Sequence, residues 1–212
     1  MASKSYSLRE EIWHSSIHGI GILLSVSALS ILCVLAGQSG DGAKIASAIV
    51  FGLALFIMYS ASTLYHAIYM PKTKSILQQI DHSAIYILIA GTYTPISLLG
   101  ITGTMGLTLF GISWSIAVIG VSLALFFPRR FERFSLVLYI LMGWMVVGFF
   151  KTLVTNLDAL TLSLLLAGGI TYTVGVIFYV WRNLPLNHAI WHVFVLGGSI
   201  FHFFMVLLLI LS

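Results

Sequence analysis

The stretch Asn187-His188-Ala189-Ile190-Trp191-His192 opens the last long apolar run of the chain, which continues to about residue 211. A run of this length is long enough to cross a bilayer as a helix. On a helix, His188 and His192 lie four residues apart on one face, one turn above the other, so that two imidazoles can bind one metal ion. A lone pair at this spacing also serves as a simple hydrogen-bonding pair, so its meaning depends on the rest of the chain.

The composition places the chain in a membrane. Of its 212 residues, 59% are apolar and only 8% are charged, whereas soluble domains carry about 25% charged residues. We expect an all-α bundle of seven transmembrane helices, forming one domain over residues 1–212 with a short polar segment at about 1–16. The predicted spans cover approximately residues 17–36, 44–66, 82–100, 105–127, 134–150, 159–181 and 188–211.

The charges predict the orientation in the membrane and argue against nucleic-acid binding. The net charge is +4, but the ten basic residues are scattered over short loops. Eight of them lie on the side of the N-terminus and only Lys44 and Lys151 on the other, which predicts a cytoplasmic N-terminus and an outer C-terminus. We expect a multi-pass protein of the plasma (inner) membrane. The single cysteine, Cys33, excludes an internal disulfide and a thiolate metal cluster.

Polar groups stand where three other predicted spans meet the cytoplasmic side. Glu11, His14 and His18 share one helical face, which favours either a plain interfacial helix or part of a site. Ser62 and His66 share a face at the end of the second span. Asp81 opens the third span, where it is either a helix N-cap or a site residue.

Six of the seven histidines therefore gather at the predicted cytoplasmic ends of four helices. Imidazoles with a carboxylate and no thiols suit zinc. His82 points about 100° around its helix from Asp81, so we expect only one of the two to face the site. His202 lies ten residues past His192, about 15 Å deeper along the helix axis, and we expect a buried hydrogen-bonding group there.

Two further features concern the helices themselves. Pro95 predicts a kink in the third span, with nearby Thr and Tyr hydroxyls satisfying freed backbone groups. Spans four to six lack acids, bases and histidines well inside them. Their glycines predict close helix packing, at Gly143, Gly148, Gly168, Gly169 and Gly175.

Three ordered motifs resemble those of the hemolysin III family: Glu11-x-x-His14-x-x-x-His18, then Ser62-x-x-x-His66 followed by the run Asp81–Pro95, then His188-x-x-x-His192. That family belongs with the progestin and adipoQ receptors and is distantly similar to alkaline ceramidases. Its first motif usually has asparagine where this chain has His14. That departure leaves His14 either as a replacement hydrogen-bonding group or as an extra metal ligand.

The resemblance implies a zinc ion held by His66, His188 and His192, a choice among six histidines that spacing alone does not make. It implies Asp81 as general base near the zinc-bound water and Ser62 beside it. Glu11 and His18, with His14, would orient the ligands. Three protein ligands leave a position for water, which is the arrangement of catalytic zinc.

Three functions remain open from the sequence. The first is an intramembrane zinc hydrolase acting on a lipid amide or ester, because the site lies near headgroup depth. The second is a membrane-homeostasis sensor in which zinc clamps helices together, without catalysis. A cytolysin or pore former is the third, and the scarcity of polar groups in spans four to six speaks against it. The sequence specifies neither the substrate nor the oligomeric state.

Overall fold

The computed structural model describes residues 6–212, apart from the side chains of 128–133, and every element in it is helical. Seven helical stretches are long and apolar enough to cross a membrane, which confirms the predicted number of spans. The elements are α1 Leu8–Ser39, α2 Gly42–Ala67, α3 Pro71–Pro95, the π-helical segment η1 Ile96–Ile101, α4 Gly103–Phe126, α5 Pro128–Gly143, the 3-10 segment η2 Met145–Phe149, α6 Phe150–Asn156, α7 Ala159–Val180 and α8 Asn187–Leu211.

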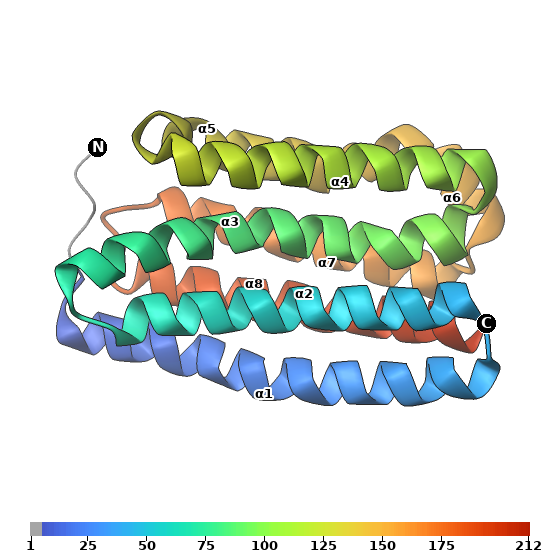
Figure 1. Cartoon of the computed structure of the whole chain (residues 1–212), viewed down its shortest axis with the longest axis horizontal. Coiled ribbons are helices and arrows are strands. Elements are labelled where there is room, and N and C mark those ends of the chain that lie inside the picture. The colour runs from blue at the N-terminus through green and yellow to red at the C-terminus, as the bar shows by residue number, and fades with distance from the viewer. Residues whose placement is uncertain (1–5) are drawn as a thin grey trace.

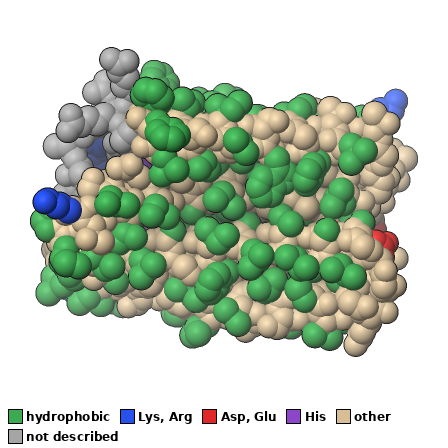
Figure 2. Space-filling view, viewed as in Figure 1, with side chains coloured by type: hydrophobic (Ala, Val, Ile, Leu, Met, Phe, Trp, Pro, Cys, Tyr) green, Lys and Arg blue, Asp and Glu red, His purple; other side chains and the backbone are tan. Residues whose placement is uncertain are grey.

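The long helices run along the long axis of the molecule (Figure 1). Helix α1 begins at the left end of this view and α8 finishes at the right end, as an odd number of spans requires. Hydrophobic side chains cover the visible face between the two ends, where few charged groups are seen (Figure 2). This surface suits a lipid environment. The assignment of the left end to the cytoplasm stays a prediction.

Helices adjacent in sequence pack side by side, and the last helix returns to the first. Helix α1 packs on α2, α2 on α3 and α3 on α4, while α8 packs on both α7 and α1. Consequently one end of the bundle holds the starts of α1, α3 and α8 and the end of α2. We call this end of the bundle the histidine end.

Two helix starts shape the histidine end. At α1, Ser7 and Glu10 form a reciprocal capping box, with the backbone N–H of Glu10 donating to Ser7 Oγ at 3.3 Å. Helix α3 begins at Pro71, whose fixed φ suits the first turn. Asp81 therefore lies well inside α3, so the N-cap interpretation of Asp81 is wrong, and the helix begins before the predicted residue 82.

The third and fifth spans contain irregular turns that support each other. After Pro95 the third span continues as the π-helical η1, and Thr92 and Thr94 donate to carbonyls of their own helix. The fifth span is not the single helix predicted over 134–150, because it breaks at Trp144 and continues as η2 and α6. The hydroxyl of Tyr93 donates to the Gly143 carbonyl and accepts from the backbone N–H of Val146, so it satisfies groups freed by that break.

Close helix contacts confirm part of the glycine prediction. A Cβ added at Gly168 or Gly175 would lie within 3.0 Å of side chains of α8. At Gly143 and Gly148 an added Cβ would meet nothing within 4 Å, so close packing does not explain those two glycines. An added Cβ at Gly169 would make only ordinary contact with Trp144 at 3.8 Å, so among the five predicted glycines the close contacts are those between α7 and α8.

Candidate metal centre and its cavity

The polar face at the start of α1 is buried in the bundle. Glu11, His14 and His18 are at most 3% exposed, so the interfacial-helix interpretation is wrong. The same end of the bundle buries His66 from α2 and His192 from α8. Imidazole and carboxylate groups lose hydration when they are buried, so each needs a partner inside the protein.

Four imidazole rings pack against one another at this end of the bundle. The rings of His14, His66, His188 and His192, which we call the histidine cluster, have all six centroid separations between 4.5 and 5.3 Å. Three helices contribute to the cluster, α1, α2 and α8. The structure thus brings together residues separated by as much as 178 positions in sequence.

The ring of His66 is oriented by Glu11. Its Nδ1 lies 2.6 Å from Oε2 of Glu11, and because a carboxylate accepts, Nδ1 is the donor. The other nitrogen, Nε2, is buried and has no hydrogen-bond partner among the described residues. A carboxylate behind one nitrogen with the other left free is the usual arrangement of a metal-binding histidine.

The ring of His192 is also oriented through its Nδ1, in this case by a backbone carbonyl. Its Nδ1 lies 3.2 Å from the carbonyl oxygen of His14 and donates to it. Its Nε2 is 3.0 Å from Nε2 of His188. Two nitrogens bound to one tetrahedral zinc at the usual distances are about 3.3 Å apart, so this pair is already close to ligand spacing.

His14 lies inside the cluster, although the family resemblance placed it among residues that orient the ligands. Ligand atoms of His14, His66 and His188 all lie within 4.8 Å of one another, so this group could hold a metal ion. Both ring nitrogens of His14 are buried without a hydrogen-bond partner among the described residues, and its Nδ1 lies 3.8 Å from Glu11. The geometry therefore favours the extra-ligand alternative for His14.

The remaining predicted orienting residue, His18, lies behind His192. The two rings are stacked at 3.6 Å with an interplanar angle of 7°. On its other side, the ring of His18 meets Tyr59 edge-on at 5.1 Å. This packing restricts the rotation of His192. Among the described residues, the group of ligand atoms that lie within 4.8 Å of one another includes neither His18 nor His192, although His192 Nε2 lies 3.0 Å from Nε2 of His188.

Two residues at this centre were missed by sequence reasoning. Lys74 donates from Nζ to Oε1 of Glu11 at 2.8 Å and to the carbonyl of Tyr65 at 2.9 Å, so it joins the α2 terminus to the Glu11 carboxylate. Tyr6 packs its ring against His14 and His188, at 4.7 and 5.2 Å. Burial raises the pKa of Tyr6 well above its usual value, so the phenol stays protonated. A lone lysine between two predicted spans and a tyrosine before a helix carry no sequence signal for these contacts.

Asp81 and Ser62 lie beside the cluster, and both side chains are buried. Both residues line a cavity of about 570 Å³ that His188 and His192 also line. His82 also lines this cavity but lies outside the histidine cluster, so the expectation that only one of Asp81 and His82 faces the site stays a prediction.

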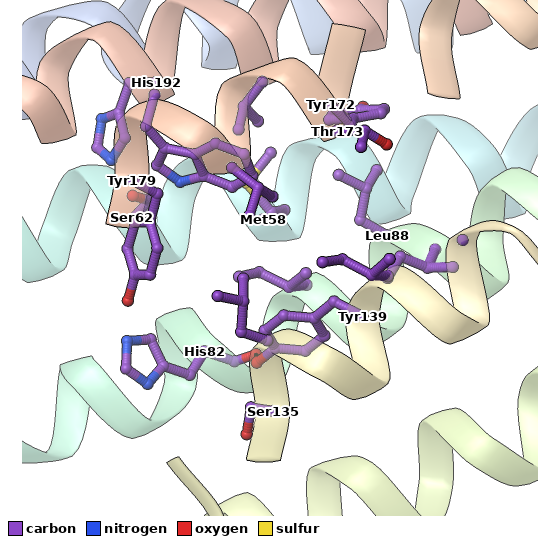
Figure 3. Close-up of a pocket in the computed structure, with 18 of the residues that line it drawn as sticks. Met58, Ser62, His82, Leu88, Ser135, Tyr139, Tyr172, Thr173, Tyr179 and His192 are labelled. Atoms are coloured by element: carbon purple, nitrogen blue, oxygen red, sulfur yellow. Dashed lines mark hydrogen bonds between the residues drawn. The ribbon is translucent and has the colours of Figure 1, made fainter. Parts of the chain in front are cut away.

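The cavity runs from the cluster into the membrane-spanning part of the bundle, between α2, α3, α5, α7 and α8. Figure 3 shows Ser62, His82 and His192 toward one side, and Leu88, Tyr172 and Thr173 toward the other. Most of its wall between these groups is apolar. Residues of this wall include Met58, Ile85, Ile89, Leu136, Val176 and Val195.

The donor set fits a zinc ion. Unprotonated imidazole nitrogens are left over on His66 and His192 once their other nitrogens have donated, and His188 and His14 lie at the same point. Nitrogen ligands without thiolates suit zinc among the common metals, although they do not exclude others. An ion bound here would use the buried nitrogens that have no partner among the described residues.

These features define a class: a seven-helix integral membrane protein with a buried histidine centre beside an internal cavity. The chain belongs to the haemolysin-III related family, whose model matches residues 6–203. It is 46% identical over 211 residues to Hemolysin-3 of Bacillus cereus, covering 100% of this chain and 96% of that protein. It is 48% identical over 202 residues to the Hemolysin-3 homolog of Bacillus subtilis (strain 168), covering 95% of each. A more distant relative is the human monocyte to macrophage differentiation factor, 26% identical over 161 residues, which are 73% of this chain and 66% of that protein.

Proposed function

We propose that this protein is a zinc-dependent hydrolase that cleaves an amide or ester bond of a membrane lipid and so serves membrane lipid homeostasis. One observation carries the proposal: His188 and His192 of the histidine cluster line the same cavity as Asp81 and Ser62, and this cavity continues as an apolar chamber. A purely structural metal would need neither the carboxylate nor the chamber.

In this proposal His66, His188 and His192 hold the zinc, and Glu11 keeps the Nε2 lone pair of His66 available by accepting from Nδ1. The ion, when bound, supplies a water of lowered pKa and polarises the scissile carbonyl. A carboxylate oxygen of Asp81 accepts the proton of the attacking water and returns it to the leaving group. The Ser62 hydroxyl donates to the negative charge that develops on the carbonyl oxygen. The apolar walls hold the chain and exclude bulk water.

The test is Asp81→Asn in the full-length protein. We expect about one zinc per chain in wild type and variant, and a loss of lipid turnover of about 100-fold or more because the general base is gone. Metal content is measured by mass spectrometry after purification, and products by lipid mass spectrometry. Asp41→Asn at the far end of the bundle is the matched control and should keep full turnover. Undiminished product from Asp81→Asn would refute the mechanism.

A second candidate, a sensor in which the metal clamps helices, is favoured by the position of His14. Four imidazoles would fill a tetrahedral zinc and leave no place for water, as in structural sites. X-ray absorption at the zinc edge counts the imidazole ligands. Four in wild type and three in His14→Asn, without lipid product in wild type, would favour the clamp. Three in both proteins would favour the hydrolase.

A further inference from the structure

The inner end of the cavity carries a histidine that the proposed chemistry does not use. His202 on α8 is 7% exposed and lines the cavity ten residues after His192, which is about 15 Å along the helix. Its Nε2 lies 3.3 Å from the carbonyl oxygen of Leu165 on α7. The expected buried hydrogen-bonding group is thus present, but it accounts for only one nitrogen of the ring.

The other nitrogen, Nδ1, is buried and has no hydrogen-bond partner in residues 6–212 as described. A carbonyl oxygen only accepts, so Nε2 carries the proton and Nδ1 of the neutral ring is an acceptor. A buried acceptor without a partner costs free energy. Nδ1 of His202 therefore destabilises the folded protein unless a hydrogen-bond donor reaches it.

The protein makes room for this ring. Gly168 lies against it so closely that an added Cβ would be 2.3 Å from His202 Nε2. Tyr172 packs beside it with a ring separation of 5.5 Å. Tyr172 also lines the cavity, and its hydroxyl lies 2.7 Å from Ser199 Oγ.

We propose that Nδ1 of His202 accepts a hydrogen bond from a hydroxyl group on the hydrocarbon chain of a bound lipid. With the polar end of that lipid at the histidine cluster, about 15 Å of helix separates the two ends of the cavity. An extended chain advances about 1.25 Å per carbon, so the hydroxyl falls roughly 12 carbons from the polar end. The inference rests on the proposed function only in that the cavity holds a lipid chain.

The probes are octadecanoic acid and its 12-hydroxy and 2-hydroxy derivatives, in competition with a fluorescent fatty acid on full-length, chelator-treated protein in nanodiscs. We expect wild type to bind the 12-hydroxy acid about 5-fold more tightly than the plain acid. The 2-hydroxy acid should show no such preference, because its hydroxyl remains near the cluster.

Two variants sharpen the test. In His202→Phe the preference should reverse, with the 12-hydroxy acid bound roughly 5-fold more weakly than the plain acid, because its hydroxyl is buried without an acceptor. Thr173→Val, a change of similar size in the same cavity, should keep the wild-type preference. If His202→Phe does not fold, the comparison of the two positional isomers on wild type decides alone.

Equal affinities of wild type for the plain and 12-hydroxy acids would overturn the inference, as would a preference that survives in His202→Phe. Equal affinities would mean that water satisfies Nδ1. Failure of all three acids to bind would instead remove the cavity as a lipid site, and with it the proposed function. Since no metal or turnover enters this assay, a protein without hydrolase activity can still support the His202 subsite.

Discussion

Two acidic side chains at each end of the helix bundle differ in their burial and in their partners. At the histidine end Glu11 and Asp81 are buried among imidazoles, a lysine and a serine. At the other end Asp41 and Asp158 are exposed and accept from the first backbone N–H groups of α2 and α7. Exposed caps help a helix to begin. Buried charges lose their hydration, and interactions with partner groups must offset that loss of free energy. Burial of these two carboxylates is not needed to begin a helix, so it supports the proposed function of the histidine end.

The partners of Glu11 show how that loss is offset. Its two carboxylate oxygens face His66 at 2.6 Å and Lys74 at 2.8 Å. One carboxylate thus links three helices, α1, α2 and α3. Asp158, by contrast, accepts hydrogen bonds from Leu160 and Thr161 in the first turn of its own helix. Variants at the histidine end should therefore change metal affinity, whereas variants at the other end should change thermal stability.

The largest effect is expected from His66→Ala at the histidine end. The change removes the nitrogen that Glu11 orients, so zinc affinity should fall by more than the roughly 100-fold typical of losing an orienting partner. The measurement is a competition titration with a chromophoric chelator. His82→Ala removes a cavity-lining imidazole outside the cluster and should keep the wild-type affinity. Equal zinc binding by His66→Ala and wild type would show that the cluster is not a metal centre.

An intermediate effect is expected from Lys74→Met. Glu11 keeps its contact with His66 but loses the ammonium group, so we expect zinc affinity to fall by about 10-fold rather than to vanish. Lys74→Arg should recover part of the loss because it keeps the charge, and Lys72→Met, at an exposed neighbouring lysine, should change nothing. The visible absorption of the cobalt-substituted protein reports whether ligand geometry changes, which a general loss of stability would not alter. An unchanged affinity and spectrum in Lys74→Met would limit Lys74 to a structural contact.

The smallest effect is expected from Asp158→Ala at the other end, measured as a drop in Tm with metal binding unchanged. Hydrogen bonds from Thr161, its hydroxyl first, hold the pKa of the Asp158 carboxyl below its usual value. Because the folded-state pKa is the lower one, this stabilisation is present above the unfolded-state value and is lost as pH falls through the folded-state value. The Tm difference should therefore be full at about pH 7 and shrink in acid. Asp158→Asn keeps a capping oxygen and should lose less. A larger Tm loss from Asp158→Ala than from His66→Ala would contradict the contrast between the two ends.

Much of the fold could be predicted from the sequence because a membrane helix is recognisable as a long run of apolar residues. The seven spans and the gathering of histidines at one end follow from counting along the chain. The break at Trp144 could not be foreseen, since its freed groups are satisfied by Tyr93 from another helix. The start of α3 was placed too late, because its first turns are polar and only Pro71 marks the beginning.

Span length and i, i+4 spacing act within one helix, so the order of residues along the chain is enough to specify seven membrane helices with imidazoles gathered at one end. Helix packing specifies that His14 lies in the cluster, that Lys74 reaches Glu11, and that a cavity joins Asp81 to His202. Those contacts depend on how each helix is rotated about its axis and packed against its neighbours. Spacing along a chain specifies which residues share a face, but only packing specifies what that face meets.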